Sequence, residues 1–253
     1  MDILPPQTLP ARTPTWRRHT PRAAHWAGGY RTYHACLRWD FGFTCAFCLL
    51  HEADLALQGT QGLGVSTAEH LVPQSVDERS ANDYTNLVYA CRFCNTARGD
   101  TSRVASGCHL LDPTKDAWTD HFQVEGDQLV PRDKDLDAAY TYKTYDLDDN
   151  RKIARRQFRR VLLAQHLQQV LQGQEIHQKI LDKAEREIAP EKSLALLREA
   201  RQIYDEVIYP GRLFLERYTA IPPDAPQRCR CRTTDMHCLP DEFLRQIVHV
   251  EVP

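Results

Sequence analysis

The sequence lacks the features that place a protein in a membrane or in the secretory pathway. No run of apolar residues approaches the ~18–20 that a helix needs to span a bilayer. The first six residues, Met-Asp-Ile-Leu-Pro-Pro, do not combine a basic segment with an apolar core, so no signal peptide is predicted. We therefore expect a cytoplasmic protein without a membrane partner.

A strong net charge is also absent. The formal charge is −2 at pH 7, which by itself does not indicate a nucleic-acid-binding protein. Basic residues are nevertheless concentrated in residues 11–38, which contain six Arg and no acid, and in residues 151–160, which contain six basic residues in ten. Local patches set the field that a phosphate backbone meets. Arg155, Arg156 and Arg159 are thus candidate nucleic-acid contacts; the alternatives are a protein-docking surface or a solvated helix face.

Internal repeats and low-complexity tracts are missing as well, so the apolar pattern alone divides the chain. We expect five segments. They are a flexible basic arm (1–28), a core with the cysteine motifs (29–110), a connecting segment with a hairpin (111–149), an α-helical hairpin (150–220) and an irregular tail containing Pro and Cys (221–253).

Apolar spacing also predicts individual helices and strands. The predictions are a helix from about 30 to 41, a loop over 53–64, strands at 65–71 and 87–90, a helix from 92 to about 102, a hairpin around 125–127, a long helix or two over 150–188, and a last helix from 190 to Pro210-Gly211. Gly173 is a weak point of the long helix, which we expect to pack on the last one.

Nine cysteines are present, and four of them form two Cys-x-x-Cys pairs, Cys45/Cys48 and Cys91/Cys94. This separation lets both thiolates of a turn reach one tetrahedral Zn²⁺. In a chain without a predicted secretion signal, metal ligation is favoured over disulfides. We therefore predict a structural zinc ion that ties the base of the 42 residues between the pairs. A second metal at Cys229, Cys231, His237 and Cys238 is a weaker candidate. Cys108-His109, beside Leu110-Leu111, is expected to lie in the core.

Further motifs lie between and after the cysteine pairs: Glu69-His70-Leu-Val-Pro, then Asn86-Leu-Val, then Asn95 and Arg98 directly behind the last cysteine. In this order and spacing, residues 29–110 resemble the HNH endonuclease family, which has the ββα-metal nuclease fold. The resemblance implies an α+β protein. It would have a small ββα-metal core with a structural zinc, followed by a mainly α-helical C-terminal region.

The resemblance also implies a role for each matched residue. His70 would be the general base, Glu69 and Asn95 would bind one catalytic Mg²⁺ or Mn²⁺, and Asn86 would hold the loop that orients the base. Arg98 would meet a phosphate. The sequence departs from the commoner family pattern by having Glu rather than Asp before the histidine, Asn rather than His at the last position, and Arg rather than Lys.

The expected activity is metal-dependent hydrolysis of DNA phosphodiester bonds. One alternative is a non-catalytic, zinc-stapled module that binds nucleic acid. Such a module would have no need of the acid–histidine pair at 69 and 70. Another alternative is a nuclease effector subunit of a multi-protein defence system, docked to a protein partner through the C-terminal helices.

Overall fold

The computed structural model describes residues 29–56, 66–101, 104–105 and 107–216. The predicted arm 1–28, the tail 221–253 with its cysteines, and residues 57–64 of the predicted loop lie outside these residues. The loop prediction is wrong for residues 53–56, which are helical. The chain divides into two compact units, which in the described residues comprise 29–157 and 158–216. No helix of the described residues is long and apolar enough to cross a membrane.

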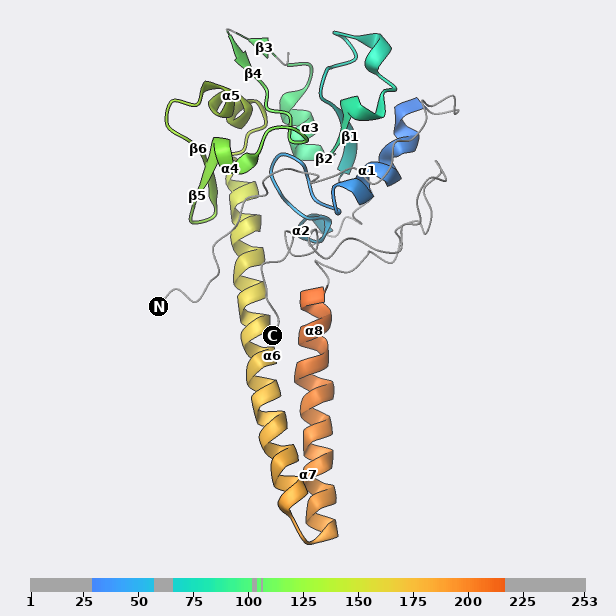
Figure 1. The fold of residues 1–253 in the computed structure, drawn as a ribbon, viewed down its shortest axis with the longest axis vertical. Helices are drawn as coiled ribbons and strands as arrows, with labels where there is room; N and C mark the ends of the chain where they lie inside the picture. The colour runs from blue at the N-terminus through green and yellow to red at the C-terminus, as the bar shows by residue number, and fades with distance from the viewer. Residues whose placement is uncertain (1–28, 57–65, 102–103, 106, 217–253) are drawn as a thin grey trace. The chain divides into compact units, whose positions relative to one another are not determined.

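The first unit begins with helices and then forms a strand pair followed by a helix. A 3₁₀ turn, η1 (Gly29–Tyr33), leads into α1 (His34–Asp40), and α2 (Glu52–Ala56) follows the first cysteine pair. Strand β1 (Ser66–His70) pairs antiparallel with β2 (Leu87–Cys91), and α3 (Arg92–Arg98) starts directly after β2. Figure 1 shows β1, β2 and α3 side by side. The two strands and the helix predicted here are confirmed.

Helix α3 ends earlier than the predicted position near 102. Gly99, which follows it, has a φ of +51°, a left-handed conformation that favours glycine and stops the helix. Two 3₁₀ turns, η3 (Glu78–Ser80) and η4 (Tyr84–Asn86), shape the segment between β1 and β2 that was predicted as a loop.

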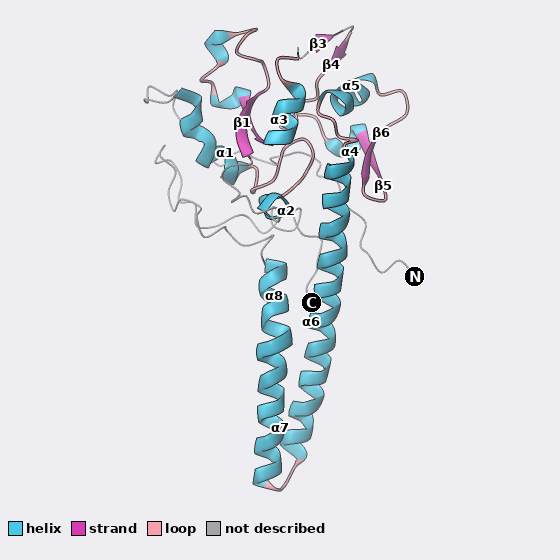
Figure 2. Cartoon of the chain, turned by 180° about the vertical axis from the view of Figure 1, so that it is seen from behind, coloured by secondary structure: helices cyan, strands magenta, loops and turns pink. Residues whose placement is uncertain are grey.

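The rest of the first unit adds two small hairpins and two helices. Strands β3 (Val104–Ala105) and β4 (Cys108–His109) pair, and the predicted hairpin at 125–127 is formed by β5 (Phe122–Glu125) and β6 (Gln128–Pro131) (Figure 2). The helices are α4 (Trp118–His121) and α5 (Leu136–Thr144). The expectation that Cys108-His109 lies in the core is wrong: Cys108 is half-buried and His109 is exposed. Helices with small antiparallel sheets make the α+β class predicted from the sequence.

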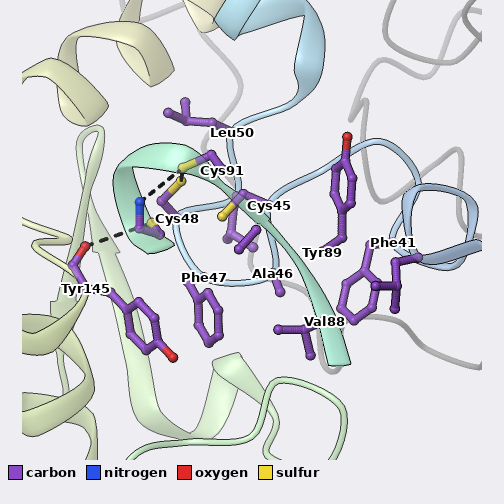
Figure 3. Close-up of a cluster of buried hydrophobic side chains, with 14 of the residues drawn as sticks. Phe41, Cys45, Ala46, Phe47, Cys48, Leu50, Val88, Tyr89, Cys91 and Tyr145 are labelled. Atoms are coloured by element: carbon purple, nitrogen blue, oxygen red, sulfur yellow. Dashed lines mark hydrogen bonds between the residues drawn. The ribbon is translucent and has the colours of Figure 1, made fainter. Parts of the chain in front are cut away.

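One hydrophobic core runs through the first unit and includes the segment 111–149. The Phe47 ring stacks on the Tyr145 ring with centroids 3.7 Å apart (both labelled in Figure 3). Trp118 Nε1 donates to the Phe47 carbonyl at 3.4 Å. Phe122, Leu129 and other side chains of this segment are fully buried against the same cluster. The turn that carries Cys45 and Cys48 is therefore enclosed by residues far away in the sequence.

The second unit consists of helices. Helix α6 (Asn150–Arg186) is one continuous element that reaches into this unit, and α7 (Pro190–Ile203) passes through a π turn, η5 (Tyr204–Ile208), into α8 (Tyr209–Glu216). The prediction that Pro210-Gly211 ends the last helix is wrong. The π turn ends at Ile208, two residues before Pro210, and such wide turns accommodate a backbone position that lacks an N–H donor.

Two glycines lie where α6 meets the helices that run back along it. A Cβ on Gly211 would come within 2.5 Å of Val170 Cγ2, and one on Gly173 within 3.1 Å of Val207 and Ile208. The rings of His166 and Phe214 stack 3.9 Å apart in the same seam. Gly173, predicted as a weak point of α6, is thus a point of close helix–helix packing.

Candidate metal-binding and catalytic site

The four cysteines of the two Cys-x-x-Cys pairs meet in a buried cluster. Their Sγ atoms lie within 4.8 Å of one another, and Cys48 Sγ and Cys91 Sγ are 3.6 Å apart (Figure 3). Zn–S bonds of ~2.3 Å in a tetrahedron place sulfur atoms roughly 3.8 Å apart, which is close to this geometry. In the described residues, no other group of three or more His, Cys, Asp or Glu side chains is arranged to hold a metal.

Backbone contacts hold the two cysteine turns in place. Cys45 N donates to the Leu50 carbonyl at 2.9 Å, and Ala46 N donates to the Tyr89 carbonyl of β2 at 2.8 Å. At the start of α3, Cys94 N donates to Cys91 Sγ at 3.5 Å, a contact that stabilises a thiolate. The donor set, its burial and its spacing therefore fit a structural zinc ion.

The thiols strongly influence one another's ionisation. Burial acts to raise the pKa of Cys45, but hydrogen bonds from the other three cysteines outweigh it and the pKa is lowered well below its ordinary value. The pKa of Cys91 is raised, chiefly by its hydrogen bond to Cys45, and the pKa of Cys94 is raised, chiefly by burial. The cluster thus favours a thiolate at Cys45 and protonated thiols at Cys91 and Cys94, and a divalent cation would take the place of those protons.

His70 lies at the end of β1 and is half-buried. Its Nε2 is 3.0 Å from the carbonyl oxygen of Ala81. A carbonyl can only accept, so Nε2 carries the proton and Nδ1 keeps its lone pair. The Tyr30 ring meets the imidazole edge-on at 4.5 Å, and the Gln74 amide lies 3.2 Å from Nε2.

The pKa of His70 is lowered from its ordinary value. Burial is the main cause; the hydrogen bond to the Ala81 carbonyl raises the pKa, and the Arg98 charge lowers it further. His70 is therefore a neutral imidazole at pH 7 and can accept a proton.

Asn86 ties down the loop that contacts His70. Its Oδ1 accepts from Val72 N at 2.7 Å, and its Nδ2 donates to the carbonyls of Val72 at 3.1 Å and Ser80 at 3.2 Å. The Ser80 carbonyl directly precedes Ala81, whose carbonyl holds the imidazole. Asn86 thus acts on His70 through the backbone and makes no hydrogen bond to its ring.

Glu69 and Arg98 form a buried ion pair. Arg98 Nη1 contacts Glu69 Oε1 and the His70 carbonyl, and Nη2 donates to the Leu71 carbonyl at 2.7 Å. Burial raises the pKa of Glu69 to about 7, although Arg98 lowers it, and Asp100 raises it further. The expectation that Arg98 meets a phosphate is contradicted, because its side chain is only 1 % exposed and is bound to the end of β1.

Asn95 lies on α3, one residue after Cys94, and is half-buried. Helix α3 packs against β1 and β2. The structure therefore brings Glu69, His70 and Asn86 together with the helix that carries Asn95, while the four cysteines join the base of that helix to the first turn.

The predicted basic contacts fall into different surroundings. Arg156 is buried and donates to the carbonyls of Asp127 at 2.9 Å and Cys48 at 3.2 Å, so its assignment as a nucleic-acid contact is wrong. The Arg155 guanidinium lies 5.0 Å from the centre of the Phe93 ring and is half-buried. Arg159 is half-buried and belongs to the second unit.

Sequence reasoning missed a buried polar network behind the first cysteine turn. Arg38 donates from Nε and Nη2 to Glu52 at 2.7 and 2.6 Å, Tyr89 Oη also contacts Glu52, and Ser66 Oγ lies 2.6 Å from Tyr89 Oη. The network fastens α1 and α2 to the strand pair. No motif signals it, because Arg38 and Glu52 are fourteen residues apart and carry no characteristic spacing.

No protein-family model, curated protein or solved structure matches this chain.

Proposed function

We propose that this chain is a metal-dependent endonuclease with a ββα-metal core, in which His70 is the general base. The observation that carries the proposal is the environment of this histidine. Its Nε2 is fixed on the Ala81 carbonyl, its pKa is lowered, and the loop that fixes it is held by Asn86. A neutral imidazole with one nitrogen anchored and the other bearing a lone pair is suited to take a proton from water.

The order of the strands and the helix supports the proposed ββα-metal core. Strands β1 and β2 are followed without a break by α3, and the four-cysteine cluster ties the start of α3 to the turn before α2. A zinc ion in that cluster would fix the base of the strand pair on which His70 lies, and thereby the position of the imidazole. The zinc would have no part in the chemistry.

Glu69 and Asn95 are the residues that would hold the catalytic cation. They offer a carboxylate and an amide oxygen, the donor types that Mg²⁺ and Mn²⁺ prefer. The ion pair with Arg98 involves Oε1 of Glu69, which leaves Oε2 for a cation. When bound, such a cation would polarise the scissile phosphate and stabilise the leaving oxygen. Arg98 would align the carboxylate and favour its ionised form against the effect of burial.

The proposal is tested by plasmid cleavage in Mg²⁺ or Mn²⁺, with an EDTA control and with zinc content measured in each sample. His70→Ala should lower the cleavage rate by about 10²–10⁴-fold, the usual contribution of a general base. His109→Ala is the matched control, because the His109 side chain is 61 % exposed and should leave cleavage unchanged. Equal cleavage by wild type and His70→Ala would overturn the assignment.

The second candidate function is a zinc-stapled module that binds nucleic acid without cutting it. The Glu69–Arg98 ion pair favours it, because a carboxylate neutralised by an arginine is also what a purely structural site contains. In the same samples, retention of DNA by a zinc-loaded protein that shows no metal-dependent cleavage would support this function over the nuclease.

A further inference from the structure

The start of helix α6 contacts the four-cysteine cluster through two buried cations. Lys152 and Arg156 are 2 % and 1 % exposed and lie one helical turn apart. Burying an amino or guanidinium group is unfavourable unless it gains hydrogen bonds and a compensating charge. The hydrogen bonds of both residues end on backbone carbonyls of the segments that surround the cysteines.

Lys152 and Cys94 share one acceptor. Lys152 Nζ donates to the Tyr145 carbonyl at 2.5 Å and to the Asp146 carbonyl at 2.9 Å, and Cys94 Sγ lies 3.9 Å from the same Tyr145 oxygen. Neutral carbonyls satisfy the donors of an ammonium group but not its charge. The sulfur atoms of the cluster lie close enough to supply compensating charge, and the Asp149 carboxylate also interacts with this ammonium.

The electrostatics of Lys152 agree with this geometry. Burial acts to lower the pKa of Lys152, yet the charges of Cys94, Cys48, Cys91 and Cys45 outweigh it and the pKa is raised. A zinc ion with four thiolates carries a net charge of about −2, so filling the site increases the negative charge that faces this ammonium.

We propose that Lys152 is the counter-charge of the four-cysteine zinc site, so that zinc affinity depends on the first turn of α6. Arg156 has a different role: it donates hydrogen bonds to the Cys48 and Asp127 carbonyls and so holds the first cysteine turn in place. Lys152 is thus a positioning residue for the metal, placed about 60 residues after the last ligand. The inference requires zinc at the four cysteines but is independent of nuclease activity.

The test compares zinc affinity, by competition with a chromophoric chelator, in wild type, Lys152→Met, Lys152→Arg and Arg151→Met. Lys152→Met keeps the apolar stem and removes the charge, and should weaken zinc binding by about 10–100-fold, as losses around a metal site do. Lys152→Arg keeps the charge and should recover most of the affinity. Arg151→Met, at an exposed side chain on the same turn, should bind zinc like wild type.

A second readout separates a charge effect from a general loss of stability. The melting temperature is measured with and without zinc, and the difference between the two reports binding to the folded state. A purely structural role lowers both temperatures and leaves the difference unchanged; the proposal requires the difference to shrink in Lys152→Met. If Lys152→Met does not fold, Lys152→Gln serves the same comparison against Lys152→Arg.

The outcomes are distinct. Unchanged zinc affinity in folded Lys152→Met or Lys152→Gln would overturn the counter-charge role while leaving the nuclease proposal untouched. A wild-type protein that binds no zinc would overturn the inference at its base. Loss of affinity in Lys152→Met that Lys152→Arg restores would establish it.

Discussion

Two pairs of basic residues at the start of α6 have opposite surroundings. Arg151 and Arg155 lie over the Phe93 ring at 5.5 and 5.0 Å, with Arg151 largely exposed, whereas Lys152 and Arg156 are buried against the cysteine turns. The two pairs are one residue apart in sequence and on different sides of the helix. A run of positive charge therefore does not indicate one function: here one face holds the core together, and the other packs its guanidinium groups over the Phe93 ring.

The largest difference between the two faces is expected in stability. Arg156→Met should lower the free energy of unfolding by about 2–4 kcal/mol, because it removes a charged donor and leaves two carbonyls unsatisfied. Arg155→Met, its neighbour over Phe93, should cost less than about 1 kcal/mol. Urea denaturation of both zinc-loaded variants measures this, and equal losses would contradict the division into two faces.

Glu69 is a buried acid that can be compared with the buried cations Lys152 and Arg156. Glu69 has a pKa of about 7 in the folded chain, above the ~4.5 of an unfolded glutamate, so the folded state holds its proton more tightly. The stability that this proton contributes is complete below pH ~4.5 and is lost as the pH rises through about 7.

The corresponding measurement is the free energy of unfolding against pH for wild type and Glu69→Gln, in zinc but without Mg²⁺. The two curves should approach each other or cross as the pH rises from 4.5 to 7, with wild type losing ~1–3 kcal/mol relative to the variant. Taking the difference removes the opposite trend of His70 and His34, whose pKa values are lowered mainly by burial. Parallel curves would refute the raised pKa.

The smallest expected effect concerns DNA binding by the helix face that carries Arg151 and Arg155. Arg155→Gln should weaken binding by a few-fold at low salt and reduce the slope of log affinity against log salt by about one, as the loss of one phosphate contact does. The experiment is a salt titration by fluorescence anisotropy, with Lys179→Gln on the second unit as the surface control. An unchanged slope in Arg155→Gln would remove this residue from the interface.

Much of the fold follows from short-range patterns in the sequence. A short β-like pattern before His70 and a short apolar run after Asn86 give β1 and β2, the turn around Gly126 gives the β5–β6 hairpin, and helical spacing gives α6. The end of the last helix was mispredicted at Pro210, because a π turn accommodates this proline and Gly211 serves a helix contact. Where this helix ends depends on how it packs against α6, which the local spacing of apolar residues does not reveal.

The candidate site is predictable to a similar extent. The spacing of the cysteines predicts their cluster, because each pair is confined to one turn. Burial of Arg98 and Arg156 could not be predicted, since their acceptors are backbone carbonyls and a carboxylate brought from other segments. The same is true of Lys152, whose partners lie in the segment before α6 and in the cysteine cluster.

The general base is tested most directly by the pH dependence of DNA cleavage at saturating Mg²⁺ or Mn²⁺. The account predicts that the rate falls on the acid side with an apparent pKa below the ordinary ~6.5 of histidine, because burial lowers the pKa of His70. It also predicts that the residual activity of His70→Ala lacks this fall. An acid limb of the same position and depth in His70→Ala would contradict the role of His70 and with it the proposed mechanism.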